Sequence, residues 1–472
     1  MTPAGRTICA LILVVAAWGG LVSGASAQDV GQAQAPVAAE EQNSEQPGAP
    51  LTLTLEDVLA RVVGGNWDIR LADLAAAEAE AALGEAKAPD RLQVSLESSY
   101  SRLGPEATMS IAVGDGDPQS ITIGPDESYS YGISLYKSLY SSGRNEALQA
   151  LAKLNIDVKD LEAAIARRQV SLAATTVFYA ITRAMGFVQV ASETSEAARE
   201  HWRIAAARYQ AGAVPKFDLM RAEVDVANAE QDLIVANTAV ETAQAALKTL
   251  LGIDVTQPIE VATTPDPSPM QIDPKLSIDL ARQRREEMAV ARKHKDQAIT
   301  AMRLARAERG ANLDFVGGYD QQSSSGFSGD YSWNLTLSLS KPLSDGGASR
   351  SKQLQALRQA EQAEALLGKT QDQIAQEVWN AYLNLEQAKS RLGSTAKTVE
   401  LAQEALRISE VRYESGLATP VEVSDARVAL TAARTNHVDA IYGYQVAEVE
   451  LLSAVNVSPE ELKGLEPRSE AQ

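Results

Sequence analysis

Cysteine, histidine and aromatic residues are scarce in this chain of 472 residues, and their scarcity excludes several kinds of protein. The single cysteine, Cys9, follows Arg-Thr-Ile rather than the small residues of a lipoprotein signal, so neither a disulfide nor a lipid anchor is expected. The three histidines, His201, His294 and His437, lack metal-ligand spacing, and no G-x-S-x-G, Walker or G-x-G-x-x-G pattern occurs. The sequence therefore predicts a protein that is not an enzyme and has no metal or cofactor.

Charge and composition narrow the class further. The formal net charge is −19, which argues against nucleic acid as a partner. Aromatic residues make up only 5% of the chain while alanine is abundant. This composition is typical of closely packed helices rather than of one thick globular core.

The first 27 residues are organised like a secretory signal peptide. Arg6 precedes an apolar run over residues 8–22, and residues 25–27 (Ala-Ser-Ala) match an A-x-A cleavage site. The run is short, contains two glycines and is followed by no second apolar stretch of spanning length, which argues against a transmembrane helix. The mature chain would begin near Gln28. Residues 28–50, rich in Gln, Ala, Glu and Pro, are expected to form a disordered N-terminal tail.

The remainder of the chain repeats itself once. Two segments recur at the same offset of 204 (341 minus 137), matching Lys137, Gly143, Arg208, Tyr209 and Gly212 to Lys341, Gly347, Arg412, Tyr413 and Gly416. This register predicts two tandem repeats, at 51–252 and 277–458, joined by a Pro-rich crossing at 253–276 and followed by a C-terminal tail at 459–472. Upstream the offset is 219, so the first repeat has 15 extra residues (219 minus 204) within 104–127. The Gly, Pro and Asp content of that segment predicts a long loop.

Each repeat contains two segments in which apolar and polar residues alternate. They predict strands at about 91–103 and 128–140 in the first repeat, and at about 312–322 and 331–343 in the second. Seven of the 13 tyrosines fall in these segments. Aromatic residues on alternating strands suit a membrane barrel with an interfacial girdle, here Tyr129, Tyr131, Tyr331 and Trp333.

The other segments have helical periodicity. One helix is expected over residues 54–88, and a second runs from Gly143 to Gln210 with Leu151, Leu154 and Val158 at the spacing of a coiled coil. The second helix would be about 100 Å long at the rise of an α-helix. A break at residues 212–215 precedes a shorter helix from Asp218 to about Leu251. Two half-length helices placed end to end would match the long one.

The number of strands bears on the assembly. Strands exposed to lipid cannot leave their edges unpaired, because nothing in hydrocarbon satisfies the backbone groups. Four strands in one chain cannot close a barrel, so closure would require eight strands from two chains or twelve from three.

At this point the chain resembles the TolC-like outer-membrane efflux proteins. The resemblance rests on LTLEDVLARVVGGN near the start, the strand ends LYSSGR and KPLSDGG, and the twin segments RYQAGAVPKFDLMRA and RYESGLATPVEVSDA, and it covers residues 52 to about 457. It implies an α+β membrane protein in which four β-strands per chain complete a 12-stranded β-barrel of a homotrimer, continued by a periplasmic α-helical coiled-coil barrel. It further implies a periplasmic adaptor and an inner-membrane pump of the RND, ABC or MFS type as partners, and contact with outer-membrane lipid.

The resemblance also assigns roles to residues near the two helix breaks. The adaptor-binding tips would be Gly212 and Ala213, and Gly416, Leu417, Ala418 and Thr419. A tight turn that needs glycine is the alternative reading of the glycines, and both readings can hold together. The periplasmic entrance or gate would contain Asp218, Tyr413, Glu422 and Asp425. Ala418 occupies the position of a family arginine, which puts the family's bridging lock in doubt.

The two acids of the second tip have rival explanations. Thr419-Pro420-Val421-Glu422 is also a capping box, so Glu422 could act as a cap or as part of the gate. Asp425 lies beyond the cap and has no basic residue three or four positions away. It could therefore belong to the gate, or it could simply lie on a solvated face of the helix.

The predicted function is the outer-membrane exit duct of a tripartite efflux or type I secretion system, located in the cell outer membrane with a large periplasmic portion. The alternative is a periplasmic coiled-coil scaffold or binding protein without channel activity.

Overall fold

The computed structural model describes residues 51–102, 104, 108–111, 119–122, 127–262, 272–323 and 329–457. The expected signal peptide, N-terminal tail and C-terminal tail lie outside these ranges. Residues from Thr52 onward belong to one compact unit.

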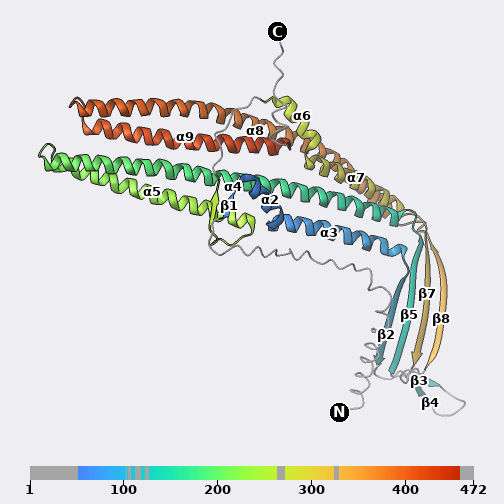
Figure 1. Ribbon diagram of the computed structural model, residues 1–472. Coiled ribbons are helices and arrows are strands. Elements are labelled where there is room, and N and C mark those ends of the chain that lie inside the picture. Colours follow the sequence, from blue (N-terminus) through green and yellow to red (C-terminus); the bar gives the residue numbers. More distant parts are fainter. Residues whose placement is uncertain are drawn as a thin grey trace, which may run out of the picture. The chain divides into compact units, whose positions relative to one another are not determined.

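Four antiparallel strands form the main sheet, in the order β2-β5-β7-β8 (Figure 1). They are β2 (Gln93–Arg102), β5 (Glu127–Tyr140), β7 (Asn312–Ser323) and β8 (Asp330–Ser340). The strands of the two halves therefore meet at the pairing of β5 with β7.

The register gives the sheet one apolar and one polar face. Directly opposed residues point to the same face, and Val94, Leu135, Gly317 and Leu335 are opposed in succession across the four strands. The same face carries, among others, Leu96, Tyr100, Ile133, Tyr319, Tyr331, Trp333, Leu337 and Leu339, which are all exposed. The opposite face is rich in serine, and hydroxyl pairs such as Ser95–Ser134, 2.6 Å apart, link its strands. A sheet with this pattern is suited to apolar surroundings on one side and water on the other.

Two details of the strand prediction were wrong. The segment expected to be a long loop within 104–127 contains a hairpin of β3 (Thr108–Ile111) and β4 (Gln119–Thr122). The prediction gave more weight to the Gly, Pro and Asp residues of this segment than to its two short runs of strand-forming residues. The fourth strand ends at Ser340 rather than near 343, because Pro342 has no N–H for the ladder.

Two long helical hairpins make up more than half of the described residues (Figure 1). The first pairs α4 (Arg144–Gln210) with α5 (Lys216–Leu251), and the second pairs α8 (Ala348–Glu414) with α9 (Pro420–Val455). Helices α4 and α8 each have 67 residues, and α5 and α9 each have 36. Each hairpin begins next to a strand of the sheet and turns back at a helix break. Both breaks therefore lie at the ends of α4 and α8 that are far from the sheet (Figure 1).

The helix expected over residues 54–88 is two helices, α2 (Leu55–Gly65) and α3 (Trp67–Lys87). Asn66 causes the break, because its side chain caps α3 by accepting from the N–H groups of Asp68 and Ile69. Its amide also donates to the carbonyl of Leu250 at 3.0 Å, which fixes the break against the end of α5. In the second half α6 (Pro274–Arg284) and α7 (Glu286–Ala307) are likewise divided, at Arg285.

Small side chains and spaced apolar residues pack the helices together. The largest fully buried side chains include Phe178 and Ile181 of α4, Ile374 of α8 and Tyr444 of α9.

One 18-residue window of α4 is apolar enough to cross a bilayer by length and composition, contrary to the prediction that no second such stretch exists. A third of that window is buried, and α4 packs against α3, α5, α7 and α9, as expected of a coiled-coil helix. The strand β1 (Leu51–Leu53), at the start of the described chain, pairs with β6 (Ile259–Val261), which lies in the segment expected to be a linker.

Candidate functional site

The candidate site is the pair of turns that close the two helical hairpins, which we call the first tip (residues 211–215) and the second tip (residues 415–419). Each contains one glycine in the left-handed region, Gly212 at φ +73° and Gly416 at φ +76°. Hydrogen bonds from Gly212 to Tyr209 and from Ala213 to Arg208 close the first turn, and equivalent bonds close the second. Glycine is needed at both positions because other residues adopt this conformation at a cost.

Glu422 serves as a helix cap in the second tip. Its carboxylate accepts hydrogen bonds from the N–H and the hydroxyl of Thr419, at 3.2 and 3.3 Å, while its own N–H donates to the Thr419 hydroxyl. The guanidinium of Arg412 lies 3.8 Å from the same carboxylate and also donates to the carbonyl of Leu417. The carboxylate of Glu422 is therefore engaged locally, while Leu417 beside it is 71% exposed.

Asp218 and Asp425 differ from Glu422 in having no partner. Asp218 lies in the first turn of α5 and is half-buried, and Asp425 lies on α9 and is exposed. Within the described chain neither carboxylate forms a hydrogen bond or ion pair, and the structure does not bring the two together. Asp425 thus remains free to face the solvent or a neighbouring chain.

Tyr413 connects the two tips. The guanidinium carbon of Arg208, at the end of α4, lies 4.9 Å from the centre of the Tyr413 ring, at the end of α8. This is a cation–π contact between the two hairpins. The sequence marked Arg208 only as the twin of Arg412, and no spacing rule could reveal that it faces the tyrosine of the other repeat.

A cavity of about 600 Å³ lies between the two hairpins behind the tips, and His201 lines it. Burial lowers the pKa of His201, Arg427 and Arg208 lower it further, and Asp225 and Glu410 oppose the change. Ion pairs close the cavity walls: Arg427 lies 3.0 Å from Glu410, and Arg434 of α9 lies 2.5 Å from Glu193 of α4. Only the second pair joins the two hairpins.

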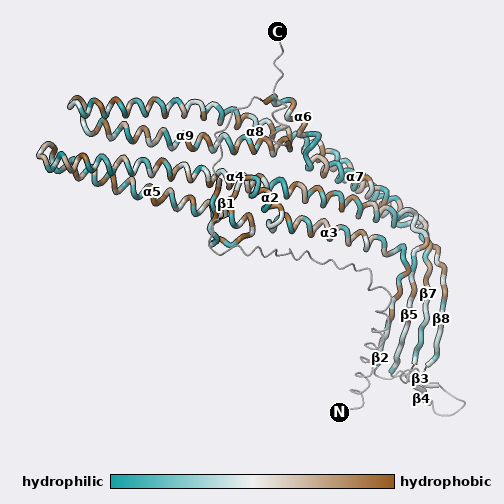
Figure 2. The backbone as a smooth tube through the Cα atoms, viewed as in Figure 1, coloured by the Kyte–Doolittle hydropathy of each residue, from teal (hydrophilic) through white to brown (hydrophobic). Residues whose placement is uncertain are grey.

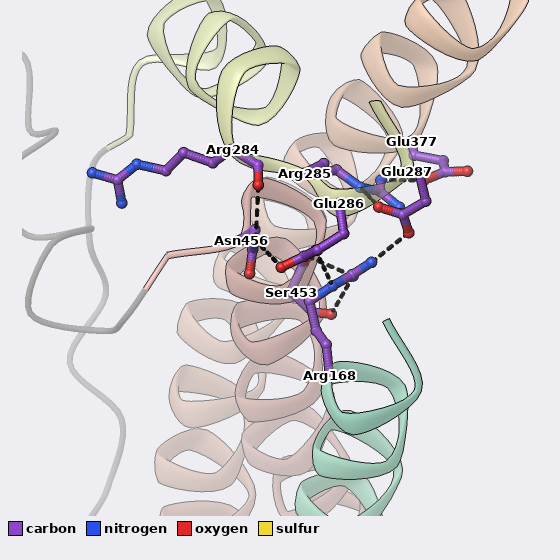
Figure 3. Close-up of polar contacts among 8 residues, drawn as sticks. All are labelled: Arg168, Arg284, Arg285, Glu286, Glu287, Glu377, Ser453 and Asn456. Atoms are coloured by element: carbon purple, nitrogen blue, oxygen red, sulfur yellow. Dashed lines mark hydrogen bonds and ion pairs between the residues drawn. The ribbon is translucent and has the colours of Figure 1, made fainter. Parts of the chain in front are cut away.

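A second polar cluster joins the halves at mid-length (Figure 3). Arg168 of α4 donates to Glu287 and to the carbonyl of Ser453, and its Nε lies 3.4 Å from Glu286. Arg285, at the break between α6 and α7, donates to Glu287 and to Glu377 of α8. We call these residues the mid-length ion network. It ties four helices, α4, α7, α8 and α9, together at one point.

Opposing effects set the pKa values in this network. Burial alone would raise the pKa of Glu287, but the hydrogen bond from Arg285 and the charge of Arg168 lower it below its ordinary value. Burial would lower the pKa of Arg285, yet its bonds to Glu287 and Glu377 raise it. Both groups therefore remain charged in the folded chain.

The four residues expected to form an aromatic girdle lie on the apolar face, in the half of the sheet away from the helices. Tyr129 packs on Tyr100 with ring centres 5.0 Å apart, and Tyr331 stacks on Tyr319 at 6.2 Å. Tyr131 and Trp333 lie on the same face by register. Among the described residues no group of three or more His, Cys, Asp and Glu side chains is arranged to hold a metal ion.

Comparison with known proteins links this geometry to a family. The model of a family described as outer membrane efflux protein matches residues 58–253 and 277–457. Protein CyaE of Bordetella pertussis is 29% identical over 314 residues, an alignment that spans 65% of this chain and 66% of that protein, just under two thirds of its length.

Solved structures share the fold. A crystal structure of CusC has a TM-score of 0.72 at 19% identity, covering 86% of this chain and 92% of that one. The outer membrane protein VceC of Vibrio cholerae has a TM-score of 0.69 at 18% identity, covering 86% of this chain and 96% of that one. The chain thus belongs to the outer membrane efflux protein family, and its location is the outer membrane, with a large helical portion in the periplasm.

Proposed function

We propose that the protein is the outer-membrane exit duct of an efflux or secretion system and works as a homotrimer. The observation that carries the proposal is the four-stranded sheet, whose outer strands β2 and β8 each pair with one described neighbour and whose apolar side chains are exposed on one face. Lipid would cover that face, and strands from other copies would satisfy the free edges. Three copies of four strands make a 12-stranded barrel, with the serine-rich face lining water.

The helices would extend this barrel as a duct. Apolar side chains such as Phe217, Ile234 and Leu401 are more than 60% exposed on the hairpins, and neighbouring copies would bury them. The equal lengths of α4 and α8, and of α5 and α9, support a tandem repeat, so that a trimer would present six similar hairpins.

The two tips would form the periplasmic entrance and dock the adaptor. An adaptor could contact two short turns, which contain Gly212 and Ala213, and Gly416, Leu417, Ala418 and Thr419; all of these residues except the half-buried Ala418 are exposed. Asp218, Tyr413, Glu422 and Asp425 would line or close the entrance. With Ala418 in place of an arginine, the cations near the tips include Arg208 and Arg412, and Arg208 would hold Tyr413 across the hairpins.

Energy and most selection would come from an inner-membrane pump of the RND, ABC or MFS type, reached through the adaptor. The duct itself would be passive and water-filled. Acids at its entrance would favour cations.

Extraction and crosslinking test the proposal. The protein should leave the membrane fraction only with detergent, run as an SDS-resistant trimer and conduct ions in planar bilayers. A photo-crosslinker at position 213 or 417 should capture a periplasmic adaptor, whereas one at position 391, on the flank of α8, should not. A protein that dissolves without detergent and conducts nothing would instead be the coiled-coil scaffold.

A further inference from the structure

A groove lies where the helices meet the sheet, between the start of α4 and the end of α7. Its volume is about 500 Å³. Small residues make up much of its lining, including Gly143, Ala147 and Ala307, and two arginines, Arg303 and Arg306, also line it. Such a lining has space for an acyl or glycerol group and a charge for an anion.

The arginines of the groove have no anionic partner in the described chain. Arg303 and Arg306 lie three residues apart on α7, and both are exposed. Like charges at this spacing destabilise a helix, although Arg306 is favoured by the negative end of α7. Figure 2 shows α7 as a predominantly hydrophilic helix leading to the sheet. A bound anion would relieve the repulsion between the arginines.

The acids at the same level are engaged elsewhere. Asp90 accepts from the amides of Asn145 and Gln149, and Glu308 pairs with Lys352 at 2.8 Å. Glu146 lines the groove but only accepts a long bond of 3.5 Å from Ser141. Two arginines against one glutamate leave the groove with an excess of positive charge.

The two ends of the sheet differ in charge. At the end away from the helices Arg102 pairs with Glu127 at 3.8 Å, and Asp320 and Asp330 add negative charge. At the helix end Leu343 is 88% exposed, and Arg144 and Arg350 are exposed next to the strands. The arginines thus lie where an apolar surface gives way to water, which is the level of lipid headgroups.

We propose that Arg303 and Arg306 bind the phosphate of an anionic phospholipid in the periplasmic leaflet of the outer membrane. The orientation of the sheet in the membrane rests on the proposed function. The forked guanidinium groups suit a phosphate, which accepts paired hydrogen bonds from each of them. The lipid would anchor the junction of duct and barrel at the membrane surface.

Lipid binding to the detergent-purified protein, counted by native mass spectrometry, tests the proposal. The probes are phosphatidylglycerol, phosphatidylcholine with the same acyl chains, and inorganic phosphate as competitor. Each arginine near an anionic headgroup contributes roughly fivefold in affinity. The double variant Arg303→Gln/Arg306→Gln should therefore bind phosphatidylglycerol roughly 25-fold more weakly than the wild type.

Two matched variants complete the experiment. Arg292→Gln/Arg391→Gln removes the same charge from helical surface remote from the sheet and should change binding by less than about twofold. Arg303→Lys/Arg306→Lys keeps the charge but loses the paired hydrogen bonds, so its affinity for phosphatidylglycerol should lie between those of the glutamine variant and the wild type. Each variant must first form the same SDS-resistant oligomer as the wild type.

Three results would overturn the assignment. They are an unchanged preference for phosphatidylglycerol in the glutamine variant, an equal loss in the remote control, and displacement of the lipid by inorganic phosphate at equal concentration. Conductance in planar bilayers is measured on the same samples. A protein that conducts but shows no preference refutes the lipid site alone, and one that does not conduct refutes the duct.

Discussion

The contact between Arg208 and Tyr413 gives the most direct test of the gate that we propose at the tips. Replacing Tyr413 by Leu removes the ring that lies 4.9 Å from the guanidinium carbon. A cation–π contact at a partly exposed site contributes about 0.5–1 kcal/mol. If three copies open together, the closed state loses roughly 1.5–3 kcal/mol, and the open population rises roughly 10- to 150-fold.

Single-channel recording in planar bilayers measures that population directly. Tyr413→Leu and Arg208→Gln should open to a similar extent, while Tyr413→Phe should remain close to the wild type because it keeps the ring and loses only the hydroxyl. Tyr209→Leu is the matched control, since the twin tyrosine has no ring contact among the described residues. Recording above about pH 7.5 keeps His201 neutral, so that loss of Arg208 acts on the tyrosine alone.

Two outcomes would refute this reasoning. If Tyr413→Phe opened as often as Tyr413→Leu, a hydrogen bond of the hydroxyl would hold the entrance instead. If Tyr209→Leu opened as often as Tyr413→Leu, general loosening of the tips would explain the effect.

Three further predictions concern charge. Asp425→Asn should reduce cation selectivity in planar bilayers more than Glu422→Gln, because the carboxylate of Glu422 is already occupied by Thr419; equal effects would assign Glu422 to the entrance. Arg285→Met should lower the free energy of unfolding by about 1–3 kcal/mol, because it leaves Glu287 with fewer partners in a half-buried site. Arg199→Met, which breaks the exposed pair with Glu230, should lower it by less than about 1 kcal/mol. Equal losses in thermal or urea unfolding would show that the mid-length ion network stabilises the fold no more than an exposed ion pair does. The pKa of His201 is lowered in the folded chain, so the contribution of His201 to stability is complete above its ordinary pKa of about 6.5 and is lost as the pH falls below that value. The Tm of the wild type should therefore drop more on acidification than the Tm of His201→Gln. Identical dependence of the two Tm values on pH would contradict the lowered pKa.

The sequence by itself determined the four main strands, the long helices and their order. Alternation at period two predicted four strands and helical periodicity predicted the long helix ending at Gln210, because these patterns reflect burial along one element. The capping box at Thr419 could also be predicted from the sequence, because all its parts lie within four residues. The division of 54–88 at Asn66 was missed although its cap on the N–H groups of Asp68 and Ile69 is local; the bond to Leu250 that fixes the break joins residues 184 positions apart and leaves no sequence pattern.

Only the tertiary structure decided which side chains face one another across elements. It placed Arg208 on Tyr413, brought Arg168 and Arg285 to Glu287, and set Arg303 and Arg306 beside the start of α4. These contacts depend on the packing of helices from both halves of the chain, and local periodicity contains no information about that packing. The sequence therefore determined the family and the positions of the tips, and the fold decided which charges can act there.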